Sequence, residues 1–208
     1  MGNDVIIVDN ICYKDILHNV RFVIRKGDKI ALIGNNEIAK TTLLNILSGN
    51  LKPDSGEIKV GTTVKISYYE KNHDKYFDKK IDMMEWLRQF SDSTDDTFIR
   101  GFLGRMLFSG EEALKKVSVL SGGEKVRCVL SKMMLSGANA LLLDEPTNHL
   151  DMESITALNE GMNRFKGNMI FTSHDHQLTQ TVANRILDIK ETGLVDREVT
   201  YNEYLGLE

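Results

Sequence analysis

Short apolar runs alternate with longer amphipathic stretches along most of the chain. The short runs are rich in aliphatic and β-branched residues and are bounded by Gly, Asn, Asp or Lys, which is typical of buried strands. They are VIIVD, KIALIG, VKISYY, ALLLDE, NMIFTS and RILDI, at 5–9, 29–34, 64–69, 140–145, 168–173 and 185–189. Apolar residues at helical intervals predict helices at 39–49, 122–137, 152–165 and 175–183. Strand followed by helix, repeated, predicts an α/β core with a mainly parallel sheet.

Two segments depart from this alternation. Residues 5–28 have no helical period between their apolar runs, which favours antiparallel strands over a strand–helix–strand crossover. Residues 79–119 carry Met, Leu and Phe at helical intervals and no clear strand, so we expect a small helical lobe inserted in the sheet. The chain, 1–208, is then one domain with an N-terminal antiparallel β-subdomain and a helical subdomain at about 81–135.

Composition narrows the class of protein. At 208 residues and 41% hydrophobic content, the chain can bury one sizeable core but is short for two domains. No apolar run approaches the roughly 18 residues that span a bilayer, and the start MGNDVIIVDN lacks the features of a secretory signal, so we expect a soluble, cytoplasmic protein. The net charge of −4 argues against strong nucleic-acid binding by this domain alone. Cys12 and Cys128 lack metal-ligand spacing, which favours free thiols.

The stretch IGNNEIAKTTLL, residues 33–44, nearly matches the phosphate-binding loop pattern G-x-x-x-x-G-K-[ST]. Gly34, Lys40 and Thr41 fall in register, while Ala39 occupies the position of the second glycine. After a strand, such a loop points backbone N–H groups and a helix N-terminus at a polyphosphate. The candidate nucleotide-binding residues of the loop are Gly34, Asn35, Asn36, Glu37, Ile38, Ala39, Lys40, Thr41 and Thr42.

Three further motifs follow this loop along the chain: SVLSGGEKVR, ALLLDEPTNHLD and FTSHD. The ordered set resembles the ATP-binding-cassette superfamily, and the resemblance covers nearly the whole chain. A lone loop match would be weak evidence, whereas four motifs in family order on the elements they require are specific. The resemblance implies the fold of a P-loop NTPase and the cofactors ATP and Mg²⁺.

The resemblance also implies a role for each polar residue at the motif ends. Lys40 would reach the outer phosphates, and Thr41 and Asp144 would hold Mg²⁺. Glu145 would polarise the attacking water, and His174 would contact the γ-phosphate and hold that water in line. The strand ALLL would deliver Asp144 and Glu145 at its C-terminal edge, where α/β sheets place ligands. The alternatives are a strand-ending turn before a proline and an ordinary capping or surface histidine.

The stretch LSGGEK contains a second candidate anion site. Ser121 as N-cap, with Gly122 and Gly123 beside it, leaves N–H donors at the positive end of a helix, although a capped helix without a ligand has the same pattern. The resemblance implies that this signature, which extends to Glu124, faces the γ-phosphate held by another cassette. Two cassettes would then sandwich ATP head to tail, with Asp151 of the stretch NHLD along their interface.

Some positions depart from the family pattern. Glu37 and Ala39 stand where glycine is usual, and a non-glycine residue forced into a left-handed conformation loses roughly 1–2 kcal/mol. Glu37 would also repel the triphosphate unless its side chain turns to solvent or pairs with Lys71. Lys71 stands where a glutamine is usual and would contact phosphate, with an exposed lysine as an equal alternative. Tyr13 is the aromatic residue nearest the expected place of adenine, with core packing as its alternative.

The particular residues of these motifs resemble those of one branch of the superfamily. DEPTNHLD, LGRMLFSGEEALKKVSVLSGGE and the closing YNEYL resemble the ABC-F group of tandem-cassette proteins that act on ribosomes, and within it the YbiT-like branch. Such proteins join two cassettes by a long helical linker, and their first cassette usually holds a helical arm. We recognise neither in this sequence and therefore expect the second, C-terminal cassette.

The resulting hypothesis is an ATPase cassette that binds ATP·Mg²⁺ and closes head to tail on the second cassette of the same protein. Its further expected partner is the ribosome, through the full-length protein, and no membrane is expected. The isolated chain should be a monomer without ATP and a weak ATPase. One alternative is the motor domain of an ABC membrane transporter, against which the NHLD stretch and the short lobe speak. The other is a degenerate nucleotide-gated scaffold, against which Glu145, His174 and the signature speak.

Overall fold

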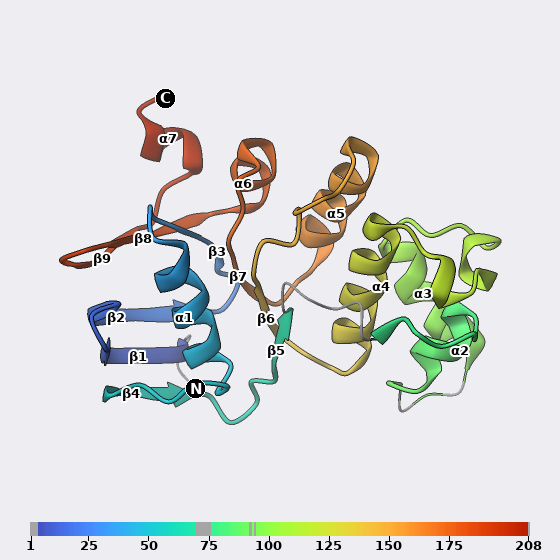
Figure 1. Ribbon diagram of the computed structural model, residues 1–208, viewed down its shortest axis with the longest axis horizontal. Helices are drawn as coiled ribbons and strands as arrows, with labels where there is room; N and C mark the ends of the chain where they lie inside the picture. The colour runs from blue at the N-terminus through green and yellow to red at the C-terminus, as the bar shows by residue number, and fades with distance from the viewer. Residues whose placement is uncertain (1–3, 70–75, 92, 94, 208) are drawn as a thin grey trace.

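The protein is built on two β-sheets that share one helix between them (Figure 1). The computed structural model describes residues 4–69, 76–91, 93 and 95–207. The smaller sheet has the order β2-β1-β4, with β1 at Asp4–Tyr13, β2 at Leu17–Arg25 and β4 at Ser55–Val60. Its strands are antiparallel, as residues 5–28 predict.

The larger sheet has the order β5-β6-β7-β3-β8-β9. Its strands are β3 at Lys29–Ile33, β5 at Ile66–Tyr69, β6 at Ala140–Leu143, β7 at Asn168–Phe171, β8 at Arg185–Lys190 and β9 at Gly193–Arg197. The five strands β5, β6, β7, β3 and β8 run parallel, and β9 pairs antiparallel with β8. The carboxyl ends of the parallel strands therefore meet at one edge of the sheet.

Helix α1, at Glu37–Leu47, fills the space between the two sheets. Its Leu43 and Leu44 are fully buried and pack in one cluster with residues of β1, β2 and the near face of the larger sheet. Helices α5, at Met152–Arg164, and α6, at His176–Val182, cover the opposite face of that sheet. Because side chains alternate along a strand, Leu142 packs toward α1 while Leu141 and Leu143 pack toward α5 and α6.

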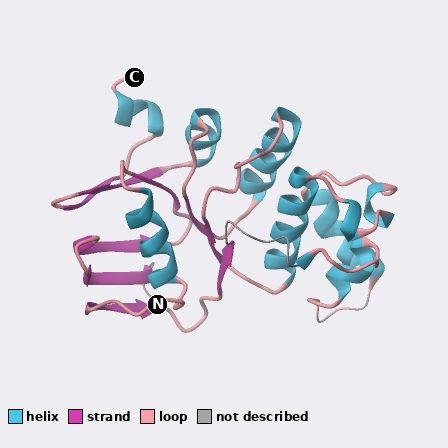
Figure 2. Cartoon of the chain, in the orientation of Figure 1, coloured by secondary structure: helices cyan, strands magenta, loops and turns pink. Residues whose placement is uncertain are grey.

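The helical lobe lies at one end of the molecule, beyond the β5 edge of the larger sheet (Figure 2). It contains α2 at Met83–Arg88, α3 at Asp96–Arg105, α4 at Gly122–Leu135 and the short 3₁₀ turns at Glu112–Leu114 and Val117–Val119. Trp86 is buried at its centre, stacks on Phe77 with ring centroids 5.2 Å apart, and donates from Nε1 to the Tyr76 carbonyl at 2.9 Å. The expected cassette fold, with its antiparallel subdomain, parallel core and helical lobe, is confirmed, and the exact limits of the lobe stay a prediction.

Sequence reasoning missed β4, β9 and the last helix, α7, at Tyr201–Leu205. Five of the six β4 residues and two of the five β9 residues are exposed, so neither strand carries a strong apolar run. α7 spans one short turn and has no buried residue. Among the residues that the structure describes, no helix combines the length and the hydrophobicity needed to cross a membrane.

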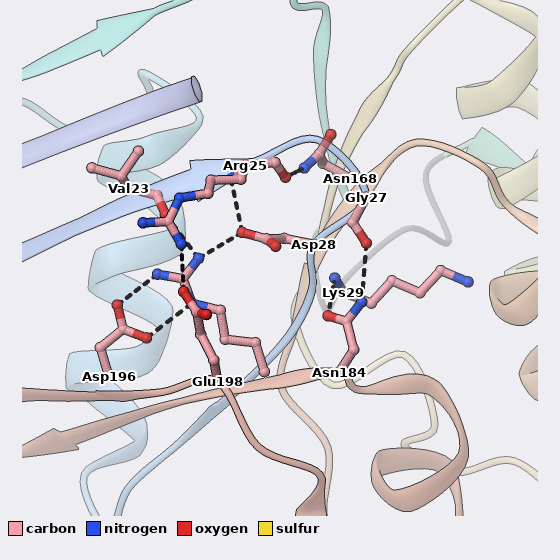
Figure 3. Close-up of polar contacts among 10 residues, drawn as sticks. Val23, Arg25, Gly27, Asp28, Lys29, Asn168, Asn184, Asp196 and Glu198 are labelled. Atoms are coloured by element: carbon pink, nitrogen blue, oxygen red, sulfur yellow. Dashed lines mark hydrogen bonds and ion pairs between the residues drawn. The ribbon is translucent and has the colours of Figure 1, made fainter. Parts of the chain in front are cut away.

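A buried arginine joins the two sheets at the end opposite the carboxyl edge (Figure 3). Arg185 of β8 donates from Nε and Nη2 to the Asp196 carboxylate of β9, at 2.9 and 2.5 Å. Its Nη1 donates to Asp28 Oδ2 at 2.6 Å and to the Val23 carbonyl of β2 at 2.8 Å. The Asp196 hydrogen bonds, with the charges of both aspartates, raise the pKa of Arg185. We call this set the Arg185 latch.

Amides and a lysine extend the contacts around the start of β3. Asn184 accepts from the Lys29 N–H at 2.8 Å and donates to the Gly27 carbonyl at 3.1 Å, and the Asn168 side chain donates to the Arg25 carbonyl. Lys29 Nζ donates to the carbonyls of Met162 and Asn163 at the end of α5, at 3.0 and 2.8 Å, and burial lowers its pKa. The smaller sheet, the core sheet and α5 are thus tied together at this end.

Arg185→Met should lower the free energy of unfolding by about 3 kcal/mol, because Asp196 and the Val23 carbonyl lose their guanidinium donors and Asp28 keeps only the Arg25 N–H. Urea unfolding measures this loss. Arg21→Met is the matched control: Arg21 pairs with Asp9 at the surface, both side chains being more than half exposed. Such a pair contributes about 0–1 kcal/mol. Equal losses in the two variants would contradict a structural role for the latch.

Candidate functional site

The loop after β3 forms a tight, capped entry into α1. Gly34 has a φ of +140°, and a Cβ placed on it would lie 2.5 Å from the Ile189 carbonyl oxygen. Both facts restrict this position to glycine. Asn36 is the N-cap of α1, and its side chain accepts from the Ala39 N–H at 3.1 Å. The loop therefore presents the N-terminus of a well-formed helix at the carboxyl edge of the sheet.

The expectation of backbone strain at Glu37 and Ala39 is wrong. Glu37 is the first helical residue of α1 and Ala39 the third, and neither belongs to the residues with positive φ. The helix has begun by these two positions, so neither requires the left-handed conformation for which glycine is favoured. Ala39 is fully buried in the cluster between the sheets, where its methyl group contributes to packing.

The pair predicted to hold Mg²⁺ comes together from two elements. Thr41 Oγ1 of α1 donates to Asp144 Oδ2 at 2.8 Å, directly after β6. Asp144 is only 1% exposed, and Thr172 donates to its other oxygen at 3.1 Å. Two oxygens of the kind that Mg²⁺ prefers therefore lie side by side at the edge of the sheet.

Three residues that sequence reasoning missed support this pair. Thr172, directly after β7, also accepts a hydrogen bond from the Glu145 N–H at 2.8 Å and so links Glu145 with Asp144. Tyr68 of β5 donates to Asp144 Oδ2 at 3.4 Å, and Asn45 donates to the Thr41 carbonyl at 2.9 Å. The only sequence signal for Tyr68 and Thr172 was their place near the ends of neighbouring parallel strands.

Glu145 and His174, the predicted catalytic residues, face each other. Glu145 is 3% exposed and has a φ of +51°, a conformation that a residue with a side chain adopts at a free-energy cost. His174 Nε2 lies 3.6 Å from Glu145 Oε1 and 3.6 Å from Glu37 Oε1, and the His174 side chain is 69% exposed. An exposed imidazole thus stands between two carboxylates at the mouth of the site.

Lys40 makes an ion pair inside its own loop. Its Nζ lies 2.6 Å from Glu37 Oε1, and the lysine as a whole is 5% exposed. Glu37 therefore neither turns away from the loop nor needs Lys71 as its partner. Lys71 itself lies outside the described residues. Thr42, the last candidate of the loop, is buried on the inner side of α1.

An open cleft of about 1360 Å³ adjoins the loop. Its walls are residues 15, 16, 18, 33–39, 188–192 and 204, so Asn35, Ile38 and Glu37 all line it. At the β1–β2 turn the wall is formed by Asp15, Ile16 and His18. Tyr13 is half-buried at the end of β1, with Lys14 Nζ 5.1 Å from its ring centroid. Its role in adenine stacking stays a prediction.

The signature lies at the N-terminus of α4, which stands apart from α1 in the ribbon (Figure 1). Ser121 and Glu124 form a capping box, in which each side chain accepts from the other residue's N–H. Lys115 Nζ lies 2.6 Å from Glu124 Oε1. Burial raises the pKa of Glu124, but the hydrogen bonds from Lys115 and Ser121 outweigh it, and the pKa is lowered. Ser121 and Gly122 are exposed, as a site for an external ligand requires.

The second signature glycine is required by packing between helices. A Cβ on Gly123 would lie 1.8 Å from Ser154 Oγ of α5, whereas one on Gly122 would have no neighbour closer than 3.8 Å. Asp151, the N-cap of α5, accepts from the Ser154 N–H at 2.8 Å, and this bond lowers its pKa. The signature and the NHLD stretch are therefore adjacent.

The chain matches the model of the ABC transporter family over residues 17–148 and belongs to this family. It is an ATP-binding cassette, and members of this family bind ATP and are ATPases. The solved structure of cbiO1 from Clostridium perfringens, part of the ABC transporter complex cbiONQ, superposes with a TM-score of 0.81. The alignment covers 99% of this chain and 92% of that one at 18% identity, which shows the fold alone.

Curated relatives are more similar in sequence. The chain is 54% identical to the ABC transporter ATP-binding protein YkpA of Bacillus subtilis (strain 168), over 99% of this chain and 39% of YkpA. It is 40% identical to the ATP-binding protein YbiT of Escherichia coli O157:H7, over 91% of this chain and 36% of YbiT. It is 37% identical to the energy-dependent translational throttle protein EttA of Haemophilus influenzae, over 94% of this chain and 36% of EttA. The chain thus spans less than half the length of these relatives.

Gly123→Ala should lower the free energy of unfolding by about 1–3 kcal/mol, because the new methyl group overlaps Ser154. Ser154→Gly in the same molecule should recover part of this loss, since it removes both atoms that the methyl group meets. A double-mutant cycle by urea unfolding measures the coupling. Gly122→Ala, which meets ordinary contact distances, should stay within about 0.5 kcal/mol of the wild type. A Gly123→Ala loss as small as this control would show that packing does not require the glycine.

Glu124 should stabilise the protein only when ionised. The pKa of Glu124 in the folded state lies below the unfolded value of about 4.3. Its contribution to the free energy of unfolding is therefore complete above about pH 5.5 and declines as the pH falls through the folded pKa. The difference in unfolding free energy between wild type and Glu124→Gln, measured from pH 3 to about 7, should follow this course. Lys115→Met should shift the decline to higher pH. A difference that does not change with pH would refute the assignment.

Proposed function

We propose that this chain binds ATP·Mg²⁺ and hydrolyses ATP as one half of a head-to-tail pair of cassettes in an ABC-F protein. The observation that carries the proposal is the convergence of Lys40, the Thr41–Asp144 pair, Glu145 and His174 at one edge of the parallel sheet. These residues come from three separate segments of the chain. Their side chains supply a cation, metal ligands, a carboxylate and an imidazole in hydrogen-bonding or near-contact range.

The loop and the oxygen pair fit a nucleotide and its metal. Gly34 allows the tight turn into α1 beside the Ile189 carbonyl, and the capped N-terminus of α1 favours an anion. Thr41 and Asp144 would hold Mg²⁺, which when bound neutralises charge on the outer phosphates. Lys40 would pair with the outer phosphates. Ser121, Gly122, Gly123 and Glu124, with Asp151, are proposed for the nucleotide of the partner cassette.

Glu145 and His174 are the proposed catalytic residues. The Glu145 carboxylate would accept a proton from water as that water attacks, and its buried position favours a proton acceptor over a solvated surface group. His174 would orient the water and the terminal phosphoryl group. Its ring is exposed and lies 3.6 Å from both Glu37 Oε1 and Glu145 Oε1, beside the loop proposed to bind the phosphates.

Exposed apolar side chains support the head-to-tail partner. Ile38 in the phosphate-binding loop, Val119 before the signature and Met152 after the NHLD stretch are 66%, 69% and 72% exposed. Large apolar groups at the three motifs that a partner cassette would cover are typical of an interface core. We therefore propose that each nucleotide needs two cassettes, and that the isolated chain is a monomer without ATP.

The ABC-F assignment, with the ribosome as partner and the cytoplasm as location, is supported by the relatives YbiT and EttA, of which EttA is by name a translational throttle protein. The chain is proposed to be the C-terminal cassette of a two-cassette protein.

Cell fractionation distinguishes this proposal from the transporter-motor alternative. The full-length protein should sediment with ribosomes in the presence of ATP, and a larger fraction of the Glu145→Gln variant should do so. Recovery with membranes and not with ribosomes would favour the transporter.

Glu145→Gln should reduce ATP turnover by the full-length protein about a hundredfold while ATP remains bound, because it removes the proton acceptor and leaves the phosphate contacts. Phosphate release and equilibrium binding of labelled ATP measure the two effects. On size exclusion, the isolated chain carrying this change should shift to a dimer in ATP·Mg²⁺ if two copies can stand in for the pair. Glu153→Gln, which changes an exposed carboxylate of α5, should retain wild-type turnover. Unchanged turnover in Glu145→Gln would exclude the proposed role of Glu145, whereas absence of turnover by the wild-type protein would favour the scaffold alternative.

A further inference from the structure

We propose that Glu37 sets the preference of this site between nucleoside triphosphate and diphosphate, by holding a carboxylate where the terminal phosphoryl group must bind. The inference rests on the proposed function, because it assumes that the loop binds ATP. It adds a specificity-determining residue that the family pattern does not contain, since glycine is usual at this position.

The first support is the ion pair between Glu37 and Lys40. Glu37 Oε1 lies 2.6 Å from Lys40 Nζ, one helical turn along α1. Lys40 is almost fully buried, so its ammonium has little access to water and depends on an anionic partner. In this structure that partner is a carboxylate of the protein. An outer phosphate that binds Lys40 has to take its place.

The second support is the position of Glu37 at the start of α1. It is the first helical residue, after the Asn36 cap, in a helix of 11 residues. A carboxylate in the first turn is stabilised by the positive end of the helix dipole. The same field favours a phosphate, and two anions cannot share the position without repulsion. Glu37 and the nucleotide therefore compete for both the ammonium and the helix end.

The third support tells which phosphate is affected. The same Glu37 oxygen that contacts Lys40 lies 3.6 Å from His174 Nε2, and that nitrogen lies 3.6 Å from Glu145 Oε1. His174 and Glu145 are the residues proposed to act on the terminal phosphoryl group and the water. The Glu37 carboxylate thus occupies the side of the site that faces the reaction, where a triphosphate has a group and a diphosphate has none.

The Glu37 side chain is able to leave this position. It is 45% exposed and lines the open cleft beside the loop, so a ligand can turn it outward without unfolding α1. ADP lacks the terminal phosphoryl group and therefore competes with the carboxylate less than ATP does. The wild-type chain should therefore bind ATP less tightly, relative to ADP, than a variant without this carboxylate.

The test is calorimetric titration of ATP and ADP, each with Mg²⁺, into the isolated chain as wild type, Glu37→Gln, Glu37→Ala and Glu153→Gln. The first two variants should raise ATP affinity about tenfold or more, the usual scale of a charge-assisted contact, and ADP affinity by much less. Glu153→Gln is the control, because it removes an exposed first-turn carboxylate of α5 and should leave the ATP-to-ADP ratio unchanged. Circular dichroism verifies that the helical content of the chain is unchanged.

The outcomes separate this inference from the proposed function. A higher ATP-to-ADP affinity ratio in both Glu37 variants, and not in Glu153→Gln, supports a selectivity role. Equal gains for both nucleotides, no gain, or a larger gain for ADP would overturn it while leaving nucleotide binding intact. Absence of binding of either nucleotide to the wild type and to every variant would overturn the proposed function itself.

Discussion

The parallel pairing of β3, β7 and β6 is the constraint on which the rest of the site depends. Ala31 pairs with Phe171, and Phe171 with Leu143, so β6 and β7 end level with each other and β3 continues two residues further, to Ile33. The residues that follow them are the phosphate-binding loop, Thr172 to His174, and Asp144 with Glu145. A shift of one residue in any of these pairings would turn the buried faces over and separate the Thr41–Asp144 contact.

The Arg185 latch acts at the opposite end of the same strands and has a complementary effect. It holds β8, β9, β2 and the start of β3 together by charge-assisted hydrogen bonds, while α1 fills the space between the sheets. The carboxyl edge can then remain polar and open to a ligand because the opposite end and the interior are densely bonded. The latch and the proposed binding site thus lie at different ends of the strands.

Much of this arrangement was predictable from the sequence because buried strands and amphipathic helices leave strong periodic signals. The apolar runs before Gly34, Asp144 and His174 indicated the strands, and parallel topology then placed their ends together. Strands with exposed residues, such as β4, leave no such signal. Long-range side-chain contacts were also invisible: the partners of Asp144 at Tyr68 and Thr172 lie 76 and 28 residues away. Local conformation was misjudged at Glu37 because the helix begins earlier than the glycine pattern suggests.

The left-handed backbone of Glu145 has a consequence for how this position can vary. With a φ of +51°, a glycine or asparagine there would relieve about 1 kcal/mol of backbone strain, while glutamate retains it. Selection for thermal stability alone would therefore tend to replace this glutamate. Lineages that do not need the proposed chemistry of this carboxylate should lose it early, so its retention in homologous cassettes would support that proposal.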